Sequence, residues 1–250
     1  MFNWSSIIIQ MIIGFLLADL LTGMAHWFED SYLGYCNDLP ILGTIAKDNE
    51  LHHYFPRSIL AYSYLEHLTF AMPMTLTAVG LLFVLNRSAF RKYFVCILTF
   101  TFFSSIANIM HRFTHMRDCE TNSVFKHMQK IGVFCSHDHH SIHHTSFSSE
   151  KYCVISEYNN YILDHFKFWS FLEYLIYIVT NIKPNRPLPY ESYHEIHNHM
   201  HENAKLSCPD KPTRSDVETL IIKLKKYKDS LAHKSTKGCV TTIHHAFEIY

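Results

Sequence analysis

The sequence predicts an all-α membrane protein, with several helices that cross the bilayer and a histidine-built metal centre at their ends. Three observations lead to this fold class. Hydrophobic residues make up 48% of the 250 residues and gather in long runs with few charges. There are 20 histidines, and most of them lie outside these runs. Lys plus Arg and Asp plus Glu both number 22, so the chain lacks the strongly basic balance typical of nucleic-acid-binding proteins.

The first apolar run, residues 7–25, is expected to cross the membrane. It carries a single charge, at Asp19. At about 1.5 Å per residue, 18–20 helical residues span a hydrocarbon core of about 30 Å. The run lacks a basic segment before it and a small-residue cleavage site after it. We therefore expect it to be retained rather than removed as a signal peptide.

Two further apolar runs, 59–86 and 93–110, are expected to cross as well, which gives at least three spans. Glu66 and His67 are the main polar residues of the second run, and ionisable groups within a span usually face the interior of a helix bundle. Residues 152–180 are aromatic but interrupted by polar side chains, which favours an interfacial helix or a re-entrant piece. The alternative, buried helices of a soluble protein, is disfavoured because such runs rarely occur three times in one soluble domain.

The order of spans and histidines places every histidine group on one face of the membrane. His26 follows the first span directly, and residues 52–53 precede the second. The third span returns the chain to the starting face with His111 and His115, and residues 137–144 follow without another crossing. Which face this is stays open. The turn at 87–92 is basic, as cytosolic turns are, but it overlaps a glycosylation sequon that is usable only in the lumen.

The spacing of the histidines predicts a centre for two metal ions. His111 and His115 stand four residues apart and project from one helix face, and the pattern H-x-x-H-H brings three more rings together. Imidazole suits iron, zinc and copper, and so many rings exceed the needs of one ion. Two ions with open positions can bind O2 and oxidise an unactivated CH2 group. The candidate ligands from spacing are His26, His52, His53, His111, His115, His140, His143 and His144.

A second set of polar residues is expected to orient these ligands. Metal-bound histidines commonly donate their other ring N–H to a carboxylate or carbonyl oxygen, and several acidic or amide residues stand near a ligand in the chain or inside a span. Ordinary helix caps or solvated side chains are an equally good interpretation. The residues of this set are Asp19, Asp30, Glu50, Glu66, His67 and Asn108.

Several segments resemble the Kua-type lipid desaturase family, in the family's order. They are ADLLTGMAHWFED (Ala18–Asp30), LPILG (Leu39–Gly43), HHYFPRSI (His52–Ile59), ANIMHRFTH (Ala107–His115), HHSIHH (His139–His144) and FWSFLE (Phe168–Glu173). The resemblance extends over 18–184 and adds His139 to the candidate ligands and Asn160 to the orienting residues. Two departures are Phe113, where the family usually has Trp, and Leu51, which replaces an acidic residue.

The resemblance implies a helical membrane desaturase of the histidine-box type, with two iron ions on the cytosolic side of the endoplasmic reticulum. The implied reaction uses O2 to remove two hydrogens from the 1-O-alkyl chain of plasmanylethanolamine, beside the ether oxygen, which forms the vinyl ether of a plasmalogen. Cytochrome b5 or an equivalent donor would supply electrons.

Other functions stay open from the sequence. A related branch of the family desaturates a phospholipid acyl chain near its carboxyl group, and hydroxylation begins with the same C–H abstraction. A histidine-rich membrane metal transporter or storage protein belongs to a different class. Transport is disfavoured because transport sites lie near the bilayer midplane, whereas these histidines lie at helix ends.

The chain is expected to divide into a membrane desaturase domain at 1–184, a histidine- and proline-rich linker at 185–214 and a tail at 215–250. Ser215 and Glu218 are predicted to form a capping box. The helix that follows is basic and amphipathic, which suits an anionic membrane surface and equally suits packing against the protein's own domain. Its apolar face is formed by Val217, Leu220, Ile221, Leu224 and Leu231. The seven cysteines form no CxxC pair, which predicts reduced thiols.

Overall fold

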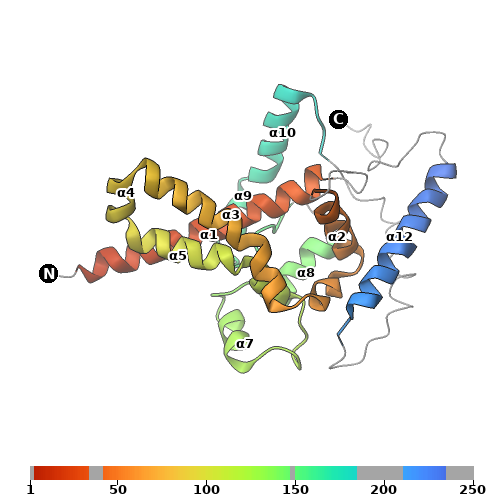
Figure 1. The fold of residues 1–250 in the computed structure, drawn as a ribbon, viewed down its shortest axis with the longest axis horizontal. Helices are drawn as coiled ribbons and strands as arrows, with labels where there is room; N and C mark the ends of the chain where they lie inside the picture. The colour runs from red at the N-terminus through yellow and green to blue at the C-terminus, as the bar shows by residue number, and fades with distance from the viewer. Residues whose placement is uncertain (1–2, 34–41, 147–149, 185–210, 235–250) are drawn as a thin grey trace.

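The computed structural model describes residues 3–33, 42–146, 150–184 and 211–234, and these ranges contain helices and no strand (Figure 1). The all-α fold class is therefore confirmed. The elements that lead to the site are α1 (Trp4–Tyr32), α2 (Leu42–Tyr54), the 3-10 helix η1 (Pro56–Ala61), α3 (Tyr64–Leu85), α4 (Arg87–Lys92), α5 (Phe94–Ser105) and α6 (Ala107–Thr114). They are followed by α7 (Ser123–Lys130), α8 (His137–Ser146), α9 (Tyr158–His165), α10 (Phe168–Thr180) and α12 (Arg214–Lys234).

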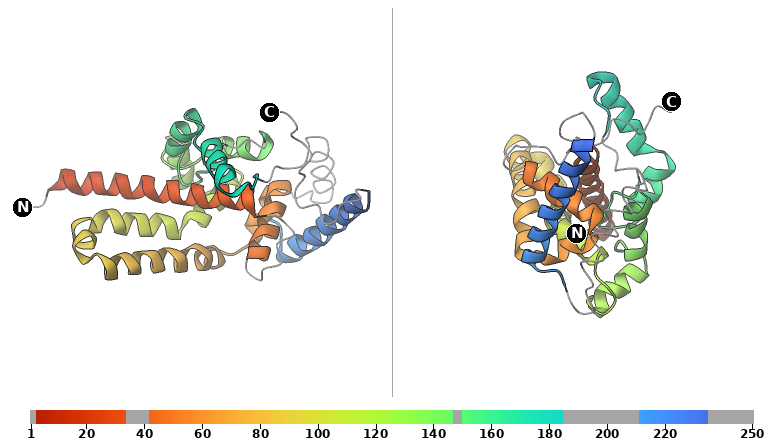
Figure 2. Two further views of the ribbon diagram at one scale, coloured as in Figure 1. Left: turned by 90° about the horizontal axis from the view of Figure 1, so that it is seen from above. Right: turned by 90° about the vertical axis from the view of Figure 1, so that its right-hand side faces the viewer.

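Two helices of the described chain, α1 and α3, are long and apolar enough to cross a membrane. Helices α5 and α6 form a third span if they are taken together, although the axis bends by 50° between them. The structure thus provides two spans, or three with the bent pair, where the sequence predicted at least three. Figure 2 shows α1, α3 and α5 running alongside one another.

The second span begins later than its hydropathy predicts. Residues 56–61 form η1 instead of membrane helix, with Pro56 at its start. Helix α3 begins at Tyr64 because Ser63 and Glu66 form a reciprocal capping box, which supplies hydrogen bonds to the free N–H groups of the first turn. Glu66 is therefore a helix cap rather than a charge buried in the span.

Helices α1 and α5 pack closely because Gly14 has no side chain. A Cβ at this position would clash with the carbonyl oxygen of Cys96 and lie 3.0 Å from Cβ of Thr99. Small residues allow membrane helices to approach closely, and here the contact is completed by Phe15 and Phe103, whose ring centres are 4.7 Å apart.

The predicted interfacial segment 152–180 is helical only in its second part. Residues 150–156 have no regular secondary structure, and α9 and α10 follow, separated by the left-handed residue Lys167 (φ 51°). Helix α10 is apolar but only 13 residues long, which is shorter than a span.

Helix α12 packs against α2 and η1 through its buried residues Val217, Leu220 and Leu224. Its first turn is capped by Thr213 and Asp216, which exchange hydrogen bonds, and not by the predicted pair Ser215 and Glu218. Most of the predicted linker and the last part of the tail lie outside the described residues, so the domain boundaries stay predictions.

The four cysteines in the described ranges do not all match the predicted reduced state. Cys96, Cys135 and Cys153 are free thiols, as expected. Cys119 is disulfide-bonded, and the prediction is wrong there.

Candidate metal centre

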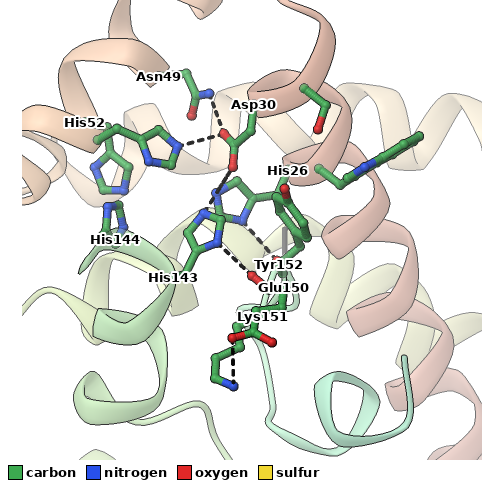
Figure 3. Close-up of polar contacts among 12 residues, drawn as sticks. His26, Asp30, Asn49, His52, His143, His144, Glu150, Lys151 and Tyr152 are labelled. Atoms are coloured by element: carbon green, nitrogen blue, oxygen red, sulfur yellow. Dashed lines mark hydrogen bonds and ion pairs between the residues drawn. The ribbon is translucent and has the colours of Figure 1, made fainter. Parts of the chain in front are cut away.

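Eight histidines and one aspartate meet in two groups near the C-terminal end of α1. Figure 3 shows part of this site, around Asp30. Helices α1, α2, α6 and α8 supply them, with His115 at the C-cap of α6. In each group the potential ligand atoms lie within 4.8 Å of one another. We call the first group the histidine cluster: His52, His111, His115, His140 and His144. We call the second group the mixed cluster: His26, Asp30, His53 and His143.

The Nε2 atoms of the histidine cluster point at one another. The distance from Nε2 of His111 is 3.2 Å to His52, 2.9 Å to His140 and 3.2 Å to His115. A neutral imidazole has one N–H to donate, so hydrogen bonds cannot satisfy so many converging nitrogens. A metal ion can. Nitrogens about 2.1 Å from one ion and at right angles lie about 3 Å apart, which matches these separations.

Burial keeps rings of this cluster in the form that binds metal. It lowers the pKa of His52, His115, His140 and His144 well below the usual value, and the neighbouring rings lower it further. Neutral imidazole is the ligand form, because the lone pair must be free. No carboxylate belongs to this cluster. Neutral imidazoles would therefore not neutralise the positive charge of an ion bound here.

Asp30 is the centre of the mixed cluster (Figure 3). Its Oδ1 accepts hydrogen bonds from Asn49 Nδ2 at 2.7 Å and from His53 Nε2 at 2.9 Å. Its Oδ2 lies 3.1 Å from Nε2 of His143 and 3.5 Å from Nε2 of His26. Burial acts against the charged form of His53, but the Asp30 carboxylate outweighs it and raises the pKa of His53.

Backbone carbonyls fix the tautomers of two histidines in the mixed cluster. Nδ1 of His26 donates to the carbonyl of Tyr152 at 3.0 Å, and Nδ1 of His143 donates to that of Glu150 at 2.9 Å. In a neutral ring, Nε2 is then a bare acceptor that faces the carboxylate of Asp30. Two acceptors at this separation repel unless a cation lies between them. Nε2 of His26 is indeed buried without a hydrogen-bond partner. The residues present therefore fit a metal ion.

The structure brings eight of the nine predicted ligands into the two clusters and places His139 outside them. Its Nε2 lies 3.1 Å from Nδ2 of Asn160, and its Nδ1 lies 3.5 Å from Glu157. Asp30, predicted to orient His26, instead offers its own oxygens to the mixed cluster.

The other predicted orienting residues have different positions. Glu50 acts on the mixed cluster through its charge, which raises the pKa of His53. Asn108 stands one turn before His111 on α6. Glu66 caps α3 and pairs with Arg214. His67 lies 3.2 Å from the carbonyl of Ile59. Glu66 and His67 belong to neither cluster.

Sequence reasoning missed the part played by residues 150–152. Their carbonyl oxygens orient His26 and His143, and a backbone carbonyl has no residue signature. Asn49, which donates to Asp30, had a usable signal because it lies on α2 one turn before His53.

Comparisons with known proteins point to one family of enzymes. The family model of the lipid desaturase domain matches residues 15–187. A protein of Acanthamoeba polyphaga mimivirus, named probable fatty acid desaturase, is 31% identical over 178 residues, or 70% of this chain and 85% of the viral one. Fatty acid desaturase 4 of Arabidopsis thaliana is 28% identical over 68% of this chain, which spans 52% of the plant protein. Plasmanylethanolamine desaturase 1 of Mus musculus is 27% identical over 71% of this chain and 68% of its own length. No solved structure matches the chain.

Proposed function

The chain belongs to the lipid desaturase domain family, and we propose that it desaturates a membrane lipid with two iron ions, one in each cluster. Family membership makes it a membrane oxidoreductase and favours an enzyme over the metal transporter or storage protein. The observation that carries the proposal is the convergence of five and four potential ligands into two adjacent groups.

When bound, the two ions would supply the activation of O2 and the oxidant for C–H cleavage. The protein's own part is to hold neutral imidazoles and one carboxylate in a buried site. His140 is fully buried and His143 is nearly so. Exclusion of water protects a strong oxidant from side reactions and leaves the lipid chain as its target.

The reaction needs electrons from outside the protein. Removing two hydrogens from a lipid while O2 is reduced to two waters requires two further electrons. We therefore include cytochrome b5, or an equivalent donor, as a partner. Such a donor reaches the clusters if this end of the helices faces the cytosol from the endoplasmic reticulum membrane, as the family resemblance implies.

The position of the clusters restricts the substrate. They lie at the ends of the membrane-crossing helices, where the lipid carbons nearest the head group are within reach. We propose the 1-O-alkyl chain of plasmanylethanolamine as the first candidate, with oxidation beside the ether oxygen to the vinyl ether. An acyl chain oxidised near its carboxyl group is the second. The relative named plasmanylethanolamine desaturase 1, 27% identical, supports the first candidate, and the two relatives named as fatty acid desaturases, 31% and 28% identical, support the second.

Lipid analysis in cells that lack plasmalogen synthesis tests this proposal. We expect the wild-type protein to raise vinyl-ether phosphatidylethanolamine at the expense of its 1-O-alkyl precursor. His143→Ala should abolish the product because it removes a ligand of the mixed cluster. Gly80→Ala is the matched control and should keep the activity, since a Cβ at Gly80 meets no atom within 4 Å.

The possible results distinguish an error in the proposed lipid substrate from an error in the proposed catalytic centre. A new double bond in acyl chains, lost in His143→Ala, would select the second candidate and keep the desaturase. Equal product from wild type and His143→Ala would remove His143 from the catalytic centre. Inserted wild-type protein that changes neither class of lipid, although supplied with iron and electron donor, would contradict both substrates.

A further inference from the structure

A segment without regular secondary structure, residues 150–156, passes beside the second half of α1, and we call it the brace. It supplies the two carbonyl groups that accept hydrogen bonds from Nδ1 of His26 and of His143. Both histidines belong to the mixed cluster. The direction in which their Nε2 atoms point therefore depends on where the brace lies.

Asp19 holds one end of the brace. Its Oδ1 accepts hydrogen bonds from the backbone N–H groups of Ile155 and Ser156, each at 3.0 Å. Its Oδ2 accepts from the Ser156 hydroxyl at 2.8 Å and from Nδ2 of Asn159 at 3.1 Å. Asp19 is fully buried and is the only charged residue of the first apolar run. Its carboxylate therefore stabilises the contact between α1 and the brace.

Asn160 and Gly23 hold the middle of the brace. Asn160 accepts from the N–H of Cys153 and donates to its carbonyl, both at 2.9 Å. A Cβ on Gly23 would lie 2.5 Å from Sγ of Cys153 and 3.2 Å from its Cα. Gly23 is therefore needed for the brace to lie against α1. Cys153 directly follows Tyr152, whose carbonyl orients His26.

We propose that Asp19 and Asn160 are positioning residues for one of the two metal positions, the mixed cluster. They fix the brace, and the brace keeps the Nε2 atoms of His26 and His143 aimed at Asp30. This inference rests on the proposed two-metal function and predicts that the two positions lose metal separately when the brace is disturbed.

Iron binding to the purified, detergent-solubilised chain tests the inference without an activity assay. Ferrous iron is added anaerobically, and iron per protein and the Mössbauer spectrum are measured. We expect about two irons per wild-type chain, and for Asp19→Leu an affinity lower by about 10–100-fold at one position only. Asp19→Asn keeps an oxygen for the two backbone N–H groups and should bind closer to wild type. Gly80→Ala should bind as wild type does.

A second variant covers the case in which Asp19→Leu does not fold. Gly23→Ala leaves every hydrogen-bonding group in place but displaces Cys153, and it should also weaken iron binding at one position. Folded variants that bind both irons with wild-type affinity, or lose both together, would overturn the role of the brace. A wild-type chain that binds no iron would instead refute the proposed function, and the brace inference with it.

Discussion

At the residue scale, the histidine cluster consists of side chains that are uncharged in the metal-free fold. Burial lowers the pKa of His52, His115, His140 and His144, and each ring suppresses protonation of its neighbours. A proton on one ring would place a positive charge against several others. The same arrangement that repels protons favours a metal ion, which accepts all of the lone pairs at once.

The metal-free protein should therefore lose stability in mild acid. The folded-state pKa of these histidines lies below the usual value of 6.5, so between the two values the unfolded chain binds more protons. The free energy of unfolding then falls as the pH drops below about 6.5. Each histidine contributes a loss of about 1.4 kcal/mol for each pH unit between its unfolded and folded pKa values. The melting temperature of chelator-treated protein from pH 8 to pH 5 measures this loss. Iron-loaded protein is the comparison and should lose stability at least as steeply, because iron binds only unprotonated rings and is released in acid. A melting temperature of the chelator-treated protein that stays constant from pH 8 to pH 5 would contradict the explanation.

The sequence predicted which histidines come together, but not how they divide between the two clusters. Spacing shows which rings share a face, as for His111 and His115, but it does not show which rings of other helices they meet. The separation of His52 from its neighbour His53 into different clusters depends on how α2 packs against α1 and α8. The four-residue spacing on α1 correctly predicted that Asp30 lies near His26. Its place among the potential ligands depends on tertiary packing, which the spacing does not show.

At the element scale, helix ends were harder to predict than helix identity. The hydropathy of 59–63 continues that of α3, but Ser63 begins the helix through its cap and Pro56 begins a separate turn. The brace was predicted as part of an aromatic helical stretch. It is not helical, because N–H groups of this segment bond to the side chains of Asp19 and Asn160, partners that local sequence does not reveal.

The packing of α1 on α5 gives a prediction at this scale. Gly14→Ala should destabilise the protein by about 1–3 kcal/mol, because the new methyl group meets the backbone of Cys96, which a side-chain rotation cannot relieve. Gly80→Ala changes the same residue type within a membrane-crossing helix and should be near neutral or slightly stabilising. Unfolding in detergent, followed by circular dichroism, compares the two variants. Equal stabilities would show that α1 and α5 do not pack in this way.

At the scale of the whole molecule, the clusters and the turn at α4 lie at opposite ends of the long helices. Helix α4 is near the beginning of α1, whereas α2 and α8 lie near its other end (Figure 1). The sequence predicted this arrangement by counting crossings, because the histidine groups return to the same face after each pair of spans. That count holds if the bent pair α5 and α6 acts as one span.

Ser88 and Asp118 should therefore be labelled from opposite sides of the membrane. Ser88 lies on α4, and Asp118 lies three residues after His115; both are exposed. We expect an impermeant maleimide to react with Ser88→Cys from one side of sealed vesicles only and with Asp118→Cys from the other side only. Vesicles with the unmodified chain set the background from native cysteines, and permeabilised vesicles show full reactivity. Labelling of both variants from the same side would mean that α5 and α6 bend back without crossing. His111 and His115 would then lie across the membrane from the histidines of α1 and α2, which would contradict the two clusters.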